Sequence, residues 1–110
     1  MTEEYKILAK AYKSIEDKVP YRPDIAIILG SGLGDLVDKF HIDASFNFKD
    51  IKNIPITTNK NHKGKFIFTR INNVNVLIMQ GRLHFYEGYL AKEAIRPVRL
   101  ANMLGANKLI

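Results

Sequence analysis

The feature that most constrains the fold is an apolar run that leads directly into a glycine-rich turn. Residues 25–29 are Ile-Ala-Ile-Ile-Leu, without polar alternation, which is typical of a parallel strand buried on both faces. Gly30-Ser31-Gly32-Leu33-Gly34 follows at once. The next apolar side chains recur every three or four residues, at Leu33, Leu36, Val37 and Phe40. This spacing forms one face of a helix, so the stretch predicts a strand, a glycine turn and a helix.

The glycine turn supports two interpretations. Glycines permit positive φ and let backbone N–H groups approach a ligand, and the helix N-terminus behind them favours an anion. On this interpretation the turn is a phosphate cradle to which Ser31 adds a hydroxyl. The glycines are equally compatible with a tight connection that binds nothing. A dinucleotide-binding fingerprint is disfavoured, because its third glycine would fall where the chain has Asp35.

The composition is that of one soluble globular domain. The chain has 110 residues, of which 46% are hydrophobic and 25% charged, and this length can bury a core. It has no cysteine, which excludes a disulfide scaffold, a thiolate metal site and a cysteine nucleophile. The first residues carry no secretory signal, and no apolar run is long enough to span a membrane. We therefore expect a cytoplasmic protein with no membrane partner.

The net charge of +6 is unevenly distributed. No acidic residue lies between Asp50 and Glu87, whereas this interval holds Lys52, Lys60, Lys63, Lys65, Arg70 and Arg82. An anionic partner is implied, although a solvated basic surface accounts for most of these lysines. Nucleic acid is disfavoured as the partner, since the basic residues are not interleaved with an aromatic stacking ladder and no nucleic-acid motif is present.

Hydrophobic spacing and turn residues predict the other elements. A helix is expected over residues 2–19, starting at Thr2 and ended by Pro20 and Pro23. Later predictions are a short strand at 45–48, a hairpin of strands 66–71 and 74–79 joined by Asn72-Asn73, a helix over 90–104 that Pro97 kinks or restarts, a helix end at Gly105, and a new strand from Lys108. This alternation predicts an α/β fold, a three-layer sandwich around a central mixed sheet, with the glycine turn at a carboxyl strand end.

A second motif, Gln80 to Tyr89, follows a predicted strand. It places Arg82, His84 and Tyr86 close together between glycines, a density that a plain connection does not need. Arg82 can bind an oxyanion with two hydrogen bonds, and His84 can donate a further hydrogen bond to it. The flat ring of Tyr86 is suited to contact a sugar or a base. Taken singly, a surface arginine, a backbone-satisfied histidine and a core tyrosine are simpler explanations; together the three residues favour a site.

His62 lies in a predicted loop, within Asn61-His62-Lys63-Gly64. A single loop histidine is usually solvated and carries little weight alone. Its place in the acid-free interval makes it a candidate for the same anion.

Together, the three motifs resemble the N-terminal part of a trimeric-type purine nucleoside phosphorylase, in both order and spacing. The segment from Arg96 to Gly105 also fits that family, and only the first helix is a loose match. The resemblance implies a phosphorylase/hydrolase-like fold, in which residues 1–110 form the truncated N-terminal part of a single domain.

For the site, the resemblance implies that phosphate is bound by Ser31, His62, Arg82 and His84. It implies that Tyr86 contacts the ribose and that His84, which lies near both, is catalytic. The family catalyses reversible phosphorolysis of purine nucleosides to free base and (deoxy)ribose 1-phosphate. Its co-substrate is inorganic phosphate, with no organic cofactor or metal, and a homotrimer is implied.

The family's base-recognition residues lie beyond Ile110, so the base preference is not encoded here. We expect residues 1–110 alone to be inactive, and to be marginally folded or self-associating because the strands flanking 25–29 and 74–79 are missing. A non-catalytic phosphate- or nucleotide-binding module, or an inactive fragment, is the alternative function. A basic nucleic-acid binder is a third, weaker hypothesis.

Overall fold

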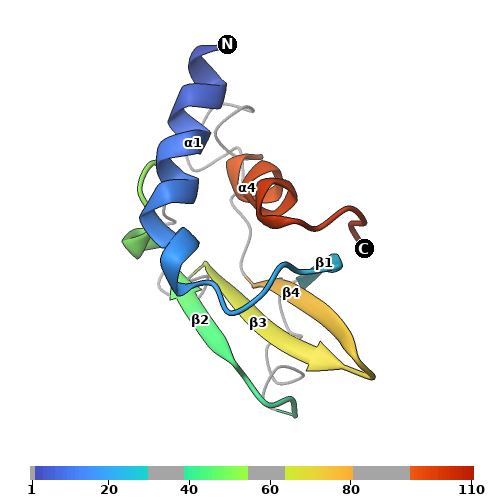
Figure 1. The fold of residues 1–110 in the computed structure, drawn as a ribbon. Helices are drawn as coiled ribbons and strands as arrows, with labels where there is room; N and C mark the ends of the chain where they lie inside the picture. Colours follow the sequence, from blue (N-terminus) through green and yellow to red (C-terminus); the bar gives the residue numbers. More distant parts are fainter. Residues whose placement is uncertain (1, 30–38, 55–63, 81–94) are drawn as a thin grey trace.

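The computed structural model describes residues 2–29, 39–54, 64–80 and 95–110. Its centre is a four-stranded sheet in the order β1-β4-β3-β2 (Figure 1). The strands are β1 (Ile25–Leu29), β2 (Ala44–Asn47), β3 (Lys65–Ile71) and β4 (Val74–Gln80). β1 runs parallel to β4, and the other two pairs are antiparallel. The predicted mixed sheet of an α/β fold is confirmed.

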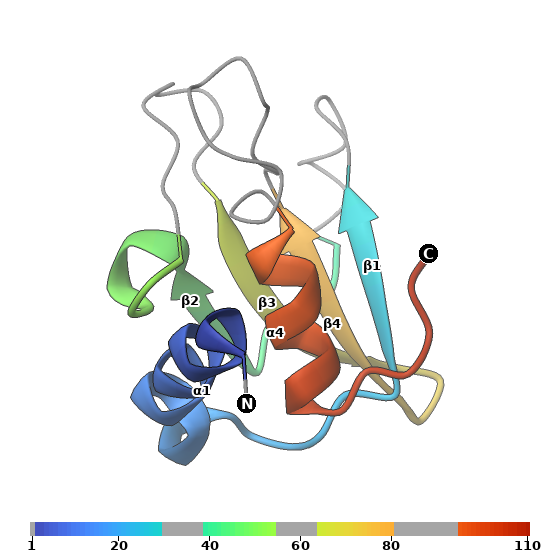
Figure 2. The same cartoon turned by 90° about the horizontal axis from the view of Figure 1, so that it is seen from above.

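Two α-helices, α1 (Glu3–Ile15) and α4 (Arg96–Leu104), pack side by side against one face of this sheet (Figures 1 and 2). The Thr2 side chain accepts a hydrogen bond of 3.1 Å from the Tyr5 amide, so the predicted helix start is confirmed. The α-helix ends earlier than predicted, because a 3₁₀ turn, η1 (Glu16–Lys18), replaces its last turn. Pro97 lies in the first turn of α4 and starts this helix rather than kinking it.

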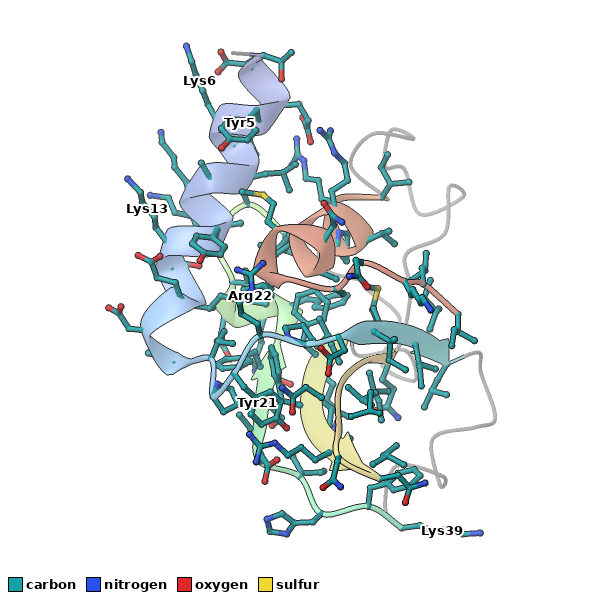
Figure 3. All side chains as sticks on the ribbon, turned by 45° about the vertical axis from the view of Figure 1, so that its right-hand side comes forward. Tyr5, Lys6, Lys13, Tyr21, Arg22 and Lys39 are labelled. Carbon is teal, nitrogen blue, oxygen red and sulfur yellow. The ribbon has the colours of Figure 1, made fainter. Side chains whose placement is uncertain are left out.

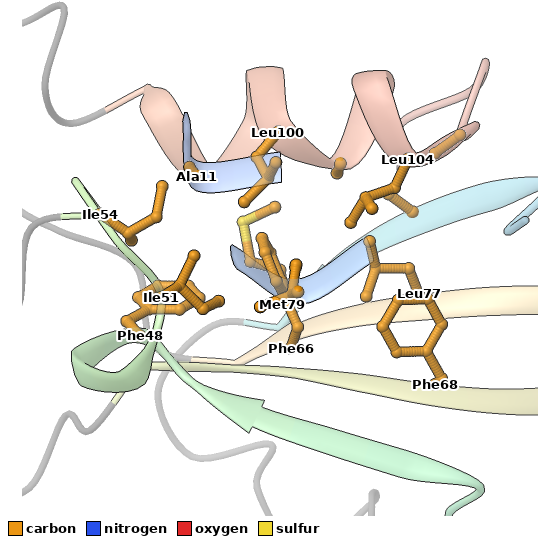
Figure 4. Packing of buried hydrophobic residues seen from close by; sticks show 14 of the residues in the cluster. Ala11, Phe48, Ile51, Ile54, Phe66, Phe68, Leu77, Met79, Leu100 and Leu104 are labelled. Atoms are coloured by element: carbon orange, nitrogen blue, oxygen red, sulfur yellow. The ribbon is translucent and has the colours of Figure 1, made fainter. Parts of the chain in front are cut away.

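The core lies on both faces of the sheet. Under the helices, Leu77 and Met79 of β4 pack with Leu100 and Leu104 of α4 (Figure 4). On the opposite face, Leu29, Ile67, Val76 and Ile78 form a second buried cluster. β1 contributes Ala26 to the first cluster and Leu29 to the second, as predicted for a strand buried on both faces. The helix predicted after the glycine turn, which would supply the third layer, falls mostly on residues 30–38, outside the described residues.

The hairpin between β3 and β4 is confirmed. Ile71 pairs with Val74, and the two turn residues have positive φ, 52° at Asn72 and 66° at Asn73. Asparagine tolerates this conformation better than most residues, and a two-residue turn of this kind matches the twist of the strands.

β2 is offset by one residue from its prediction, because Phe48 leaves the strand to begin a 3₁₀ turn, η2 (Phe48–Asp50). Phe48 is buried, and its ring meets the Phe66 ring edge-on with the centroids 5.1 Å apart. Burial of the aromatic ring in the core therefore ends the strand.

The expectation that flanking strands are missing is wrong for β4, which has β1 on one side and β3 on the other. β1 also has backbone partners on its free side, because the Ala26 amide donates to Lys108 O and the Ile110 amide to Ala26 O, each at 2.9 Å. The predicted strand beginning at Lys108 is observed as this parallel bridge. In the described part of the chain, no helix is long and apolar enough to cross a membrane.

Candidate functional site

The predicted site residues all fall outside the described residues. This holds for Ser31, His62, Arg82, His84 and Tyr86. Their roles stay predictions, and the structure describes the strand ends to which their segments are attached.

These attachment points lie together at one edge of the sheet. Leu29, which precedes the glycine turn, pairs with Gln80, the residue before the second motif. Lys65, which follows the histidine motif, pairs with Gln80 from the other side. Three segments far apart in the sequence therefore join the fold at three adjacent strand ends (Figure 2). In open α/β sheets, ligands bind outside the carboxyl ends of the parallel strands, and β1 and β4 both end here.

Gly64, the last residue of the histidine motif, is packed against the core. Its carbonyl accepts a hydrogen bond of 2.9 Å from the Phe48 amide. A Cβ atom added to Gly64 would lie 2.2 Å from Cδ2 of the Phe48 ring, so no larger residue fits without displacing the whole ring. The glycine thus holds the carboxyl end of the motif against Phe48 of η2.

Gln80 is a site candidate that the sequence reasoning did not single out. Its Oε1 atom is buried and has no hydrogen-bond partner in the described part of the chain. A buried acceptor without a donor is costly, and this one stands at the strand end where the three segments meet. The sequence signal is the single polar residue that ends the apolar run Val76–Met79.

Lys65, which is half-buried at the start of β3, places a basic side chain at this edge. Among the described residues, no group of histidine and acidic side chains could hold a metal ion. Lys52 is placed elsewhere, beside Lys6, Lys10 and Lys13 in an open hollow of about 640 Å³ along α1. Figure 3 shows Lys6 and Lys13 pointing away from the sheet, as expected for a solvated basic surface.

Arg70 belongs to a polar network at the opposite end of β3. Its guanidinium carbon lies 4.6 Å from the centroid of the Tyr21 ring, and its Nε donates to Asn75 Oδ1 at 2.9 Å. The Tyr21 hydroxyl donates to Asp43 Oδ2 at 2.7 Å. Burial, and then this hydrogen bond, raise the pKa of Tyr21 above its ordinary value. Arg70 therefore has a structural role, away from the edge where the motifs attach.

No protein-family model matches the chain. Individual curated proteins and solved structures, however, match it over almost its whole length. Purine nucleoside phosphorylase 1 of Geobacillus stearothermophilus is 37% identical over 103 residues, which cover 94% of this chain and 38% of the relative. A Schistosoma mansoni purine nucleoside phosphorylase in complex with acetate superposes with a TM-score of 0.86 at 34% identity, over 99% of this chain and 40% of that one. Isoform 2 from the same organism, in complex with cytosine and ribose-1-phosphate, gives a TM-score of 0.80 at 36% identity, over 96% of this chain and 37% of that one.

The mixed sheet and these superpositions define an α/β fold that the chain shares with solved purine nucleoside phosphorylases. Over almost its whole length, the chain is similar to purine nucleoside phosphorylases. It spans about 38% of the length of the curated relative.

Proposed function

We propose that the full-length gene product catalyses the reversible phosphorolysis of purine nucleosides to free purine base and (deoxy)ribose 1-phosphate. This chain would supply the phosphate- and ribose-binding part, as the N-terminal part of a single domain. The observation that carries the proposal is the pairing of Gln80 with both Leu29 and Lys65. It brings the attachment points of all three motifs to one sheet edge.

The proposed phosphate ligands are Ser31, His62, Arg82 and His84. Arg82 suits the anion because its planar guanidinium can give two parallel hydrogen bonds to phosphate oxygens. Tyr86 would contact the ribose, and His84, between the anion and the sugar, would be catalytic. Inorganic phosphate is the proposed co-substrate, with no organic cofactor and no metal.

In the proposed reaction, a phosphate oxygen forms a bond to the anomeric carbon of the nucleoside as the glycosidic bond to nitrogen breaks. The electron pair of that bond leaves with the purine, which takes up a proton. The sugar passes through an oxocarbenium-like state, which the anion held in line stabilises by its charge. Catalysis by these residues is thus positioning and electrostatic stabilisation.

The proposed partners are phosphate and a purine nucleoside, in a cytoplasmic homotrimer that binds neither nucleic acid nor membrane. The ribose-1-phosphate bound to the Schistosoma mansoni isoform 2 supports a sugar-phosphate subsite in a relative of this chain. Residues 1–110 alone are expected to release no base, because they span only about 38% of the curated relative.

The test is a kinetic comparison in the full-length gene product. Arg82→Ala should raise the KM for phosphate by roughly 10- to 100-fold, since it removes charge-assisted hydrogen bonds. Lys52→Ala, in the hollow beside α1, is the matched control and should change this KM less than twofold. Equal effects would show diffuse charge instead of a site, and phosphate binding without base release would favour the non-catalytic module.

Tyr86→Ala, measured in the same assay, distinguishes ribose binding from phosphate binding. This variant should weaken nucleoside binding and leave phosphate binding nearly intact, because Tyr86 is assigned to the ribose. The reverse pattern would refute the assignment.

A further inference from the structure

Arg96, the first residue of α4, forms a shielded ion pair with Glu4 of α1. Its Nε and Nη2 atoms donate to the two carboxylate oxygens of Glu4 at 2.6 and 3.2 Å. Its Nη1 atom donates to the backbone carbonyl of Asn53 at 3.1 Å. The Arg96 and Glu4 side chains are only 13% and 14% exposed. The pair is bidentate and largely removed from water, so breaking it leaves an uncompensated charge.

Asn53 is itself fastened to α1. Its side-chain Nδ2 donates to Ile7 O at 3.0 Å, and the neighbouring Lys52 amide donates to the Ser14 hydroxyl oxygen at 3.3 Å. Asn53 has a positive φ of 67°, so the chain turns sharply where Arg96 holds it. The guanidinium of Arg96 therefore ties together α1, the turn at residues 51–54 and the start of α4.

The two ends held by this guanidinium border the segments that carry the proposed ligands. Ile54 directly precedes residues 55–63, and Ile95 directly follows residues 81–94. The other ends of these two segments are held by the hydrogen bond between Phe48 and Gly64 and by the pairing of Gln80 in the sheet. Through its hydrogen bond to Asn53 O, Arg96 links one end of the histidine segment to one end of the arginine segment.

We propose that Arg96 is a positioning residue for the phosphate and ribose site, acting through the two segment ends that it joins. The inference rests on the proposed function. Reaction rates depend steeply on geometry, and a misplacement of about 1 Å can cost on the order of 100-fold in rate. Arg96 makes no contact with substrate in this account, and its effect passes through the backbone at Asn53 and Ile95.

The test uses the full-length gene product, with Arg96→Gln compared with Arg99→Gln. Arg99 lies one turn along the same helix and is exposed, so its replacement removes the same charge without breaking the ion pair. Phosphate binding is measured by calorimetry and nucleoside phosphorolysis by a rate assay, both at a temperature below the unfolding range. Thermal unfolding of each variant is measured separately. We expect Arg96→Gln to raise the Kd for phosphate by about tenfold and Arg99→Gln to leave it within twofold.

Two further variants keep the proposal testable if Arg96→Gln fails to fold. Arg96→Lys keeps the charge but loses the planar fork, and should give an intermediate Kd for phosphate. Glu4→Gln should weaken phosphate binding, whereas Glu3→Gln, at an exposed neighbouring position, should not.

The outcomes separate this inference from the proposed function. If the wild-type protein converts nucleosides and the Arg96 and Glu4 variants lose thermal stability but keep phosphate Kd and KM, Arg96 is only structural and the inference is overturned. If the wild-type protein shows no phosphorolysis, the proposed function fails, and a positioning role in that reaction fails with it. The inference is supported if the wild-type protein is active and phosphate binding is weaker in the Arg96 and Glu4 variants but not in the Arg99 and Glu3 controls.

Discussion

The absence of a side chain at Gly64 lets the Phe48 ring lie directly against the backbone that ends the histidine motif. This contact connects the hydrophobic core with the proposed phosphate-binding motif. Phe48 is 2% exposed and belongs to the main core, while Gly64 ends a motif that we assign to phosphate binding. A glycine in a proposed anion-binding loop therefore has a packing role that is independent of any ligand.

Replacing this glycine should destabilise the fold. Gly64→Ala places a methyl group 2.2 Å from a ring carbon of Phe48, and overpacking of this kind costs about 1–3 kcal/mol. Denaturant unfolding measures the loss, with the exposed Lys49→Ala as a control expected to stay within about 0.5 kcal/mol. An unchanged free energy of unfolding in Gly64→Ala would show that the Phe48 ring moves aside without cost, which would contradict this prediction.

Tyr21 gives the fold a dependence on alkaline pH. Burial and the hydrogen bond to Asp43 favour the neutral phenol and raise its pKa above the ordinary value of 10.0. The stabilisation is complete below pH 10 and is lost as the pH rises from there toward the folded-state pKa. In Tyr21→Phe the free energy of unfolding should fall less steeply above pH 10 than in the wild type. Tyr5→Phe, at an exposed position, should keep the wild-type slope; equal slopes in all three proteins would contradict this account.

Among the elements, the β3–β4 hairpin depends most on its turn residues. Asn73 has a φ of 66°, a conformation that costs most non-glycine residues about 1–2 kcal/mol. Asn73→Ala should lower the free energy of unfolding by about 1 kcal/mol, and Asn73→Gly should not lower it. Asn47→Ala, at an exposed residue with ordinary extended backbone, is the control. Equal losses in the two alanine variants would mean that the turn conformation contributes nothing.

Elements with strong local signals could be predicted from the sequence. The apolar run at Ile25–Leu29 predicted its strand, and the Asn-Asn pair predicted the hairpin. Pro97 and Gly105 predicted the start and the end of α4. Each signal acts within a few residues, through backbone preference or burial.

Element ends set by tertiary contacts could not be predicted in this way. Phe48 alternates like a strand residue, yet it leaves β2 because its ring is drawn into the core beside Phe66. The Arg96–Glu4 pair joins residues 92 positions apart, and neither residue carries a local sign of its partner.

At the scale of the whole molecule, the order of the strands brings together the strand ends to which the three motifs are attached. The sequence shows that each motif adjoins a predicted strand, but it does not show that β1 inserts beside β4. That pairing places Leu29 and Lys65 on either side of Gln80. It also makes β4 a central strand, which corrects the expectation that its neighbours are missing.

The site residues themselves rest on local chemistry and on the family. Hydrogen-bonding capacity and motif spacing single out Ser31, His62, Arg82, His84 and Tyr86, and the described structure adds the common edge to which their segments attach. Gln80 shows what local reasoning misses, since the burial of its Oε1 atom is a property of the folded chain and leaves no sign in the neighbouring sequence.

The most direct test of the central claim is a crystal structure of the full-length gene product grown with inorganic phosphate. We predict one phosphate within hydrogen-bond distance of Ser31, His62 and Arg82, outside the ends of β1 and β4. A phosphate bound instead among the lysines beside α1, with none at the strand ends, would contradict the account.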